Sequence, residues 1–302
     1  MSSLNQTRLF MTSSFTHDHS MSDDEFQLLR DCIYAHCGIY FDHDSKYILE
    51  KRLSPRLTDL NLPTFYDYYH FLKYNRSKQQ ELMDIMDVVT TNETYFFRES
   101  FQLKAFSDEI IPELIKSKSA RGNRSLRIWS AGCSTGEEPY TIAMLLSTIS
   151  ELSGWKIEII GTDISQKVLQ RARCAVYGKS SFRATEESDL RRFFHQQDDG
   201  YKVNDSIREL VTISHLNLFD TNALAMLGKV DLIFCRNVII YFDKAAKKRV
   251  IESFHSALYD GGFLLLGHSE SLMNITTLFT LRHFKNDMIY QKPDRLSTGG
   301  AL

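Results

Sequence analysis

The chain has 302 residues, of which 43% are hydrophobic and 25% are charged, and its formal net charge is −2. This length can bury a sizeable core as one large domain or two ordinary ones. The nearly neutral charge argues against a globally basic nucleic-acid binder. No apolar run reaches the roughly 18 residues typical of a membrane span. We therefore expect a globular protein without nucleic-acid binding or direct membrane insertion.

The five cysteines lack paired CxxC spacing, and the ten histidines show no HExxH-like pattern. We therefore expect reduced thiols in a cytoplasmic protein, without a metal site. Residues 1–20 carry no apolar signal core and are predicted to form a flexible leader, and residues 294–302 a flexible tail.

Residues 21–91 show a helical pattern throughout. Ser22 and Glu25 form a capping box before the first helix, and Thr64 begins the third. Pro55 lies inside the second apolar pattern and predicts a kink or a restart there. The sequence indicates a compact helical domain without a catalytic constellation.

From residue 92 to residue 293 the pattern changes to strands alternating with helices, which predicts a mostly parallel sheet covered on both faces. One helix is predicted over Asp243–Leu258, with Asp243 as N-cap and Gly261 just past its end. The predicted strands are Leu126–Trp129, Ile157–Ile160, Val211–Ser214, Asp231–Cys235 and Phe263–Leu266.

Two segments depart from this alternation. Leu281–Phe284 and Met288–Gln291 flank a short polar turn, which predicts an antiparallel hairpin closing the sheet. Residues 181–210 include a polar stretch that fits neither pattern, and we expect a small insertion there. The fold class is therefore α/β, preceded by a small all-α domain.

A glycine-containing loop, Gly132–Gly136, joins a strand to a helix that begins near Glu137 and Glu138. Glycines at such a turn let the backbone approach a ligand at the carboxyl edge of a sheet. No GKS or GKT follows, which argues against a phosphate-binding P-loop. The carboxylates suit a cationic ligand such as S-adenosylmethionine. Alternatively, one or both only favour the helix N-terminus electrostatically.

Polar residues also follow three later strands. Asp163 is placed to accept both ribose hydroxyls of a nucleoside, or else to cap the next helix. Asn217 and Leu218 could contact an adenine ring, although a plain turn explains them equally well. Arg236, Asn237 and, further on, Tyr241 converge where a methyl donor would lie, with a core position as the alternative for Tyr241.

These motifs occur in a recognisable order. They are Thr91–Arg98, Gly132–Tyr140, Gly161–Asp163, Arg236–Asn237 with Tyr241–Phe242, and Leu266–Leu272. Over roughly Ser22 to Lys292, the chain closely resembles the bacterial chemotaxis receptor methyltransferases, which form methyl esters on specific receptor glutamates.

The resemblance implies a helical receptor-recognition domain joined to a Rossmann-like S-adenosylmethionine-dependent methyltransferase domain. S-adenosyl-L-methionine would be the cofactor and S-adenosyl-L-homocysteine the product. The implied cofactor contacts are Asn92, Thr94, Arg98, Glu137, Glu138, Asp163, Asn217, Leu218, Arg236 and Asn237, with Arg98 and Tyr241 nearest the transferred methyl.

The expected chemistry needs no general base, because a glutamate with a pKa of about 4.3 is already ionised at neutral pH. Transfer requires a desolvated carboxylate oxygen in line with the methyl–sulfur bond. An arginine fork can hold such a carboxylate. We therefore expect Arg98 to orient the substrate and Tyr241 to act as a second positioning donor.

The resemblance also implies that a basic helix meets the acidic cytoplasmic methylation region of transmembrane receptors. Lys46, Lys51, Arg52 and Arg56 are the matching residues, and an ordinary solvated face is the alternative. Some family members bind a receptor's C-terminal peptide through a glycine-rich loop of the insertion. The matching stretch here, His195–Lys202, has one glycine, so we expect independence from such a tether.

We expect a monomer in the cytoplasm that is recruited to receptor arrays and supports sensory adaptation. Two other hypotheses stay open on the sequence alone. The chain could methylate another protein or a small molecule, or it could be a non-catalytic module that senses the cofactor.

Overall fold

The computed structural model describes residues 19–294. Most of the predicted leader and tail therefore lies outside the described residues. Within the described part of the chain, no helix is long and apolar enough to cross a membrane. All five cysteines are free thiols, as predicted.

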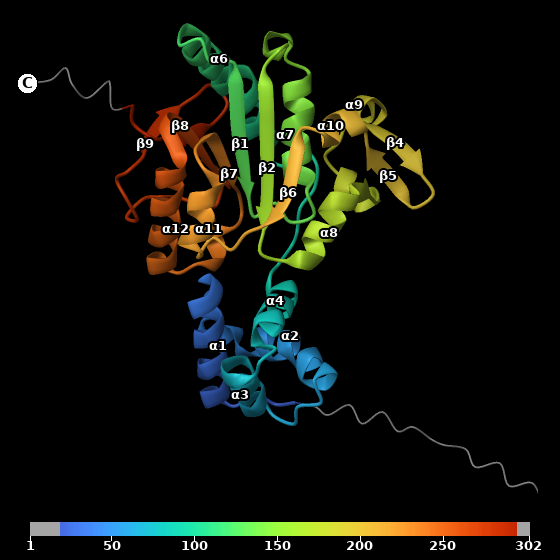
Figure 1. Cartoon of the computed structure of the whole chain (residues 1–302), viewed down its shortest axis with the longest axis vertical. Coiled ribbons are helices and arrows are strands. Elements are labelled where there is room, and N and C mark those ends of the chain that lie inside the picture. The colour runs from blue at the N-terminus through green and yellow to red at the C-terminus, as the bar shows by residue number, and fades with distance from the viewer. Residues whose placement is uncertain (1–18, 295–302) are drawn as a thin grey trace, which may run out of the picture.

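The N-terminal part consists of four helices around a shared apolar core (Figure 1). The capping box is confirmed, because the Ser22 hydroxyl accepts from the Glu25 N–H and the Glu25 carboxylate accepts from the Ser22 N–H. The four helices are α1 (Asp23–Cys37), α2 (Lys46–Asp59), α3 (Phe65–Tyr74) and α4 (Lys78–Val89).

The predicted restart at Pro55 is wrong, because α2 runs through it to Asp59. Proline removes one intrahelical hydrogen bond and crowds the preceding turn. Leu53 and Leu57 lie on either side of Pro55 and are fully buried in the helical core. The burial of these side chains holds the helix together across the proline.

The larger part is an α/β domain with one seven-stranded sheet, as predicted. The strands lie in the order β6-β2-β1-β7-β8-β10-β9, and all neighbouring pairs from β6 to β8 are parallel. These strands are β1 (Ser125–Ala131), β2 (Lys156–Asp163), β6 (Val211–His215), β7 (Val230–Cys235), β8 (Leu258–Leu266), β9 (Thr280–His283) and β10 (Met288–Gln291).

Helices cover both faces of this sheet, and β7 shows why. Leu232 and Phe234 belong to one buried cluster, whereas Ile233 and Cys235 belong to another. Side chains of a strand alternate between faces, so each face of β7 needs its own cover. The α-helices of the larger part, including those of its insertion, are α5 (Ser100–Ala105), α6 (Ile111–Ala120), α7 (Glu137–Ser147), α8 (Gln166–Cys174), α9 (Glu187–Phe193), α10 (Asp205–Arg208), α11 (Thr221–Leu227) and α12 (Lys244–Ala257).

The helix predicted after Asp243 is confirmed, with the Asp243 carboxylate accepting from the Ala246 N–H at 2.8 Å. Its predicted end at Leu258 agrees with the structure, where Leu258 is the C-cap, but Gly261 does not terminate the helix. The helix stops at Ala257, and Gly261 lies inside β8, with a φ of 79°. The chain thus passes from helix to strand without a glycine cap, and Gly261 supplies an unusual backbone conformation within the strand.

The insertion is a small antiparallel sheet in the order β3-β5-β4, flanked by short helices. Its strands are β3 (Val176–Tyr177), β4 (Phe194–Gln197) and β5 (Gly200–Val203). The first strand precedes the predicted start at residue 181. A two-residue strand is too short to show a period, and only its pairing with β5 identifies it.

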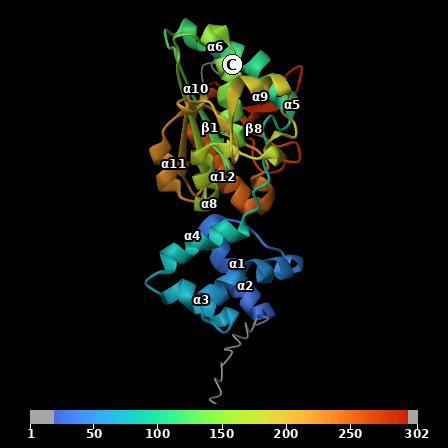
Figure 2. The ribbon, with the colours of Figure 1, turned by 90° about the vertical axis from the view of Figure 1, so that its right-hand side faces the viewer.

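The carboxyl ends of β1 and β2 point toward the helical part (Figure 1), and the chain passes from α4 into the α/β part beside this edge (Figure 2). Several contacts join the two parts here, among them three hydrogen bonds. The Tyr34 hydroxyl donates to Asp243, the Tyr40 N–H donates to the Tyr241 carbonyl at 3.0 Å, and the Ser165 hydroxyl donates to Asp87 at 2.6 Å. The N-terminal helices therefore cover this edge of the sheet and form a roof over it.

Candidate active site

A cavity of about 350 Å³ lies between the roof and the sheet edge. Both parts of the chain line it. The N-terminal part contributes Ile39, Tyr40, Ile48 and Arg52, the connecting segment contributes Thr90–Tyr95 and Arg98, and the α/β part contributes Gly132–Ser134, Glu138, Asp163, Leu216–Leu218, Arg236–Val238 and Tyr241.

The glycine-containing loop after β1 forms one wall. Gly132 and Gly136 have φ values of 79° and 93°, which glycine adopts readily. A Cβ on Gly132 would lie 2.4 Å from a Val238 methyl carbon, and one on Gly136 would lie 2.9 Å from the Ala172 Cβ. Neighbouring side chains occupy this space, so these glycines permit close packing of the protein around the loop.

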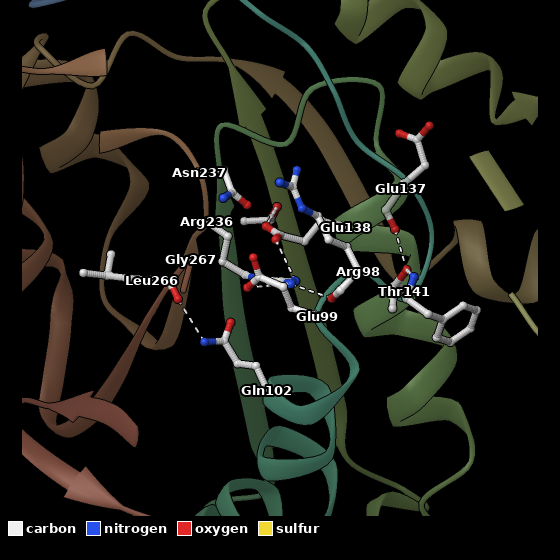
Figure 3. A network of polar contacts seen from close by, with 12 residues as sticks. Arg98, Glu99, Gln102, Glu137, Glu138, Thr141, Arg236, Asn237, Leu266 and Gly267 are labelled. Carbon is white, nitrogen blue, oxygen red and sulfur yellow. Dashed lines mark hydrogen bonds and ion pairs between the residues drawn. The ribbon is translucent and has the colours of Figure 1, made fainter. Parts of the chain in front are cut away.

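The side chains of the two adjacent glutamates at the start of α7 point in different directions. Glu138 lines the cavity, accepts from the Ser130 hydroxyl at 2.7 Å and pairs with Arg236 at 3.3 Å. Glu137 accepts from the Thr135 and Ser181 hydroxyls and points away from the group around Arg236 (Figure 3). Burial raises the pKa of both carboxyls. Glu138 is thus placed for a ligand, whereas the Glu137 side chain braces the loop.

Asp163 ends β2 and lines the cavity. Its carboxylate accepts from the Ser134 and Ser165 N–H groups at 2.9 Å each. The cap of α8 is the Ser165 side chain, so Asp163 is not the N-cap. Burial raises the pKa of this carboxyl, and the two backbone donors oppose that rise. The remaining lone pairs of this carboxylate can accept further donors.

Asn217 and Leu218 both line the cavity. The Asn217 amide group donates to the His36 carbonyl at 2.7 Å, and its oxygen accepts from the Phe219 N–H at 2.9 Å. The Asn217 side chain therefore ties the loop after β6 to α1. A contact between Asn217 and an adenine ring stays a prediction.

Arg236 follows β7 and is almost fully buried, with 3% of its side chain exposed. Its guanidinium lies between Glu99, at 3.1 Å, and Glu138, at 3.3 Å, and donates to the Arg98 carbonyl (Figure 3). Such paired, charge-assisted bonds hold a buried arginine in one orientation. Arg236 consequently fixes the backbone at Arg98.

Asn237 has a left-handed backbone, with a φ of 60°, and its N–H donates to Glu270 at 2.8 Å. Glu270 also accepts from the N–H groups of Gly267 and Ile240, and burial raises the pKa of its carboxyl. Glu270 thus holds the loop from Arg236 to Tyr241 in shape. The Asn237 residue lines the cavity, and its side-chain oxygen is buried without a hydrogen-bond partner.

Arg98 and Tyr241, the residues predicted nearest the transferred methyl, both line the cavity. The Arg98 guanidinium donates to the Glu93 carbonyl at 3.0 Å and lies 5.6 Å from the centre of the Tyr95 ring. No carboxylate among the described residues forms an ion pair with it. Its fork is therefore available to an acidic group.

The four basic residues predicted to meet the receptor have different surroundings in the structure. Arg52 lines the cavity and donates to Val89 and Thr91. Arg56 instead forms a bidentate pair with buried Glu81, at 2.6 and 2.9 Å, and also pairs with Asp84. Arg56 therefore has no free charge for a substrate and is not on an ordinary solvated face, because these carboxylates satisfy it. Lys46 pairs with Asp23, and Lys51 is exposed.

Several lining or supporting residues were not predicted from the sequence. Glu99 and Glu270 lie within or next to the quoted motifs, but only the fold shows that they hold Arg236 and Asn237. Ile39, Tyr40 and Ile48 come from a part of the chain without recognisable chemistry. Their apolar type gave no signal that would separate a cavity wall from a core position.

The residues present fit S-adenosylmethionine. The unpartnered Asn237 oxygen and the Glu138 carboxylate suit an ammonium group, and the Asp163 carboxylate suits hydroxyl donors. Asn92 and Thr94 also line the cavity. No group of three or more His, Cys, Asp or Glu side chains within residues 19–294 could hold a metal ion.

Comparison with known proteins identifies the family. The description "CheR methyltransferase, all-alpha domain" matches residues 24–90, and "CheR methyltransferase, SAM binding domain" matches residues 92–287. Chemotaxis protein methyltransferase 2 of Vibrio cholerae serotype O1 is 36% identical over 91% of this chain and 95% of its own length. A chemotaxis protein methyltransferase of Borreliella burgdorferi is 36% identical, covering 86% of this chain and 92% of its own length. The chain therefore belongs to the CheR methyltransferase family, whose members use S-adenosylmethionine.

Proposed function

We propose that this methyltransferase forms methyl esters on glutamate side chains of bacterial chemotaxis receptors. The observation that carries the proposal is the cavity-facing arginine fork of Arg98, which has no carboxylate partner among the described residues and lies in a site without a free base. The names of the similar proteins, chemotaxis protein methyltransferases, support the same substrate class.

The cavity wall offers little to deprotonate a neutral substrate. Its two thiols are buried, and burial raises the pKa of Cys37 to about 12 and that of Cys133 well above its usual value. The cavity-lining carboxylates each have a partner, since Glu138 pairs with Arg236, Glu93 pairs with Arg183, and Asp163 accepts from two backbone N–H groups. An amine or alcohol would need a base, whereas a carboxylate arrives ionised. The site thus favours an acidic acceptor.

The bound cofactor supplies an electrophilic methyl group on a sulfonium. Arg98 would hold the acceptor carboxylate through one or two charge-assisted bonds, and the Tyr241 hydroxyl would donate to the same group. Arg236 keeps the Arg98 backbone in place, and the roof of N-terminal helices limits access of water. Orientation and desolvation therefore supply the catalysis.

Arg52 would contribute to binding the acidic receptor segment, because it lies on the cavity wall within the helix that also carries Lys46 and Lys51. No tether to a receptor's C-terminal peptide is proposed. The one glycine of the β4–β5 hairpin, Gly200, is required by packing, since a Cβ there would lie 2.4 Å from the Tyr177 carbonyl oxygen.

The test mixes methyl-labelled S-adenosylmethionine, the protein and receptor-containing membranes from its own source. Label on a receptor-sized band that mild base releases as methanol would establish a carboxyl methyl ester. Base-stable label, or label on small molecules alone, would refute the receptor glutamate. Receptors shortened at the C-terminus should be methylated at an unchanged rate, and a loss of rate would refute independence from the tether.

A further inference from the structure

The insertion contacts the segment that carries Arg98. The Phe96 N–H donates to the Ser181 carbonyl at 2.9 Å. The Phe96 ring is fully buried, with its centre 4.8 Å from that of Tyr177, 5.4 Å from Phe182 and 4.9 Å from Phe194. The three aromatic partners all belong to the insertion. The segment is therefore anchored in the core of the small sheet two residues before Arg98.

The same stretch of the insertion also braces the glycine-containing loop. The Tyr177 hydroxyl donates to the Thr135 carbonyl at 2.7 Å, and the Ser181 hydroxyl donates to Glu137 at 2.9 Å. One short piece of chain thus holds both the cofactor loop and the Arg98 segment. The insertion is consequently part of the support of the site.

Arg183, which directly follows this stretch, reaches the same two residues as Arg98. Its guanidinium pairs with the Glu93 carboxylate at 2.6 Å and lies 3.8 Å from the centre of the Tyr95 ring. Arg98 bonds the Glu93 carbonyl and lies 5.6 Å from the same ring centre. Glu93 and Tyr95 both line the cavity. A shift of either residue would therefore move the Arg98 fork.

The backbone around Arg98 needs such support. Phe97 and Glu99 have φ values of 58° and 56°, a left-handed conformation that costs free energy for residues other than glycine. It persists only where surrounding contacts impose it. The Phe97 N–H bond to Thr141, at 3.2 Å, and the Arg236 bond to the Arg98 carbonyl hold one side. The insertion supports the other side of the segment through its contacts with Phe96.

We propose that Arg183 is a positioning residue for methyl transfer, which acts through Glu93 and Tyr95 on Arg98. The insertion of this protein is then a support that keeps the Arg98 segment in its strained, productive conformation. This inference rests on the proposed role of Arg98 toward the acceptor carboxylate. A surface ion pair alone adds little stability, so the effect should be on turnover more than on folding.

The test compares Arg183→Ala with Arg191→Ala. Arg191 pairs with Glu187 in an exposed bond within the same insertion and has no such link to the site. Misplacement of a positioning group by a fraction of an ångström predicts that Arg183→Ala lowers kcat about tenfold, with KM for S-adenosylmethionine changed by less than about twofold. Arg183→Lys should recover part of the rate, and Arg191→Ala should resemble the parent. Equal effects of the two alanine variants would overturn the proposal.

A double-mutant cycle decides whether Arg183 acts through Arg98. In an Arg98→Lys background the guanidinium fork is already absent, so Arg183→Ala should change kcat by less than about twofold. Additive effects would overturn the proposal. If the parent enzyme itself forms no base-labile ester on receptors, the proposed function fails instead.

A second readout needs no acceptor. Hydrogen exchange at the Phe96 and Phe97 amides should be faster in Arg183→Ala than in Arg191→Ala, because the contacts that hold the segment are fewer. Unchanged exchange at both amides would overturn the proposed support, whatever the methyl-transfer assay shows.

Discussion

Two clusters of an arginine and its carboxylate partners, one in each part of the molecule, have different consequences. In the helical part, Arg56 is held by Glu81 and Asp84, and Glu81 also accepts from the Tyr68 hydroxyl. In the α/β part, Arg236 is held by Glu99 and Glu138. The first cluster closes a helical core, whereas the second lines the cavity and fixes the Arg98 carbonyl.

The surroundings of an arginine thus decide its role. Arg56 and Arg236 are both charged and both paired, so neither has a free fork for an acidic substrate. Arg98 and Arg52 are the cavity-lining arginines without a carboxylate partner among the described residues. Substitutions of these four residues should therefore give four distinguishable results.

The largest effect is expected for Arg98→Ala. Loss of the fork that orients the acceptor should lower kcat by roughly 10²-fold, the scale expected when a reacting group is misplaced by about 1 Å. Affinity for S-adenosylhomocysteine should change much less. Methyl transfer to receptors and calorimetric binding of the product measure the two effects, and an unchanged kcat would refute the assigned role.

Arg56→Ala and Arg236→Ala should distinguish an arginine that only stabilises the fold from one that also supports cofactor binding. Each alanine variant leaves a largely buried carboxylate without its ion-pair partner, Glu81 in one and Glu138 in the other, which typically costs about 3–5 kcal/mol of unfolding free energy. Arg236→Ala should also weaken cofactor binding, because Glu138 and the Arg98 segment lose their partner. Arg56→Ala should bind S-adenosylhomocysteine normally in its folded fraction. Urea unfolding and calorimetry test this, and impaired binding by folded Arg56→Ala would contradict the division.

Arg52→Ala should have a smaller effect. Loss of one cavity-lining charge that faces an acidic substrate should raise KM for the receptor by roughly tenfold, since a charge-assisted bond contributes about 1.5 kcal/mol. The rise should shrink at high salt because the interaction is screened. Initial rates at two ionic strengths measure it, and Lys51→Ala tests a second basic residue of α2 in the same way. A KM that does not respond to either variant would remove α2 from substrate binding.

The smallest effect concerns the neighbouring glutamates. Burial raises the pKa of Glu137 above its ordinary value of 4.5, so the ionised form is disfavoured in the folded protein. The wild type should therefore lose stability as pH rises from about 4.5 through the raised pKa, relative to Glu137→Gln. The resulting difference in unfolding free energy should be smaller than the effects of the arginine substitutions, because the Thr135 and Ser181 hydroxyls oppose the rise in pKa.

Urea unfolding of both proteins between pH 4 and pH 8 measures this difference. Glu138→Gln serves as the matched change on the cavity side and should weaken cofactor binding, whereas Glu137→Gln should not. A weaker affinity for the cofactor in Glu137→Gln but not in Glu138→Gln would reverse the assignment of the two residues.

The sequence predicted much of the fold because many signals are local. The Ser22 capping box, the Asp243 N-cap and the apolar strands depend on neighbours a few residues apart. The predicted hairpin agrees with β9 and β10. Most predicted site residues also line one cavity, because polar residues after parallel strands meet at one edge of the sheet.

Other properties were decided by contacts between distant parts of the chain. Glu137 and Glu138 are equivalent in sequence, and the Ser181 and Arg236 side chains separate them. Arg56 looked like a surface charge until Glu81, 25 residues away, satisfied it. Pro55 lies within a helix because Leu53 and Leu57 are buried against other helices. The sequence by itself determined the elements and the chemical types at the site. The tertiary structure alone decided which charges stay free, because pairing and burial depend on residues that local patterns do not connect.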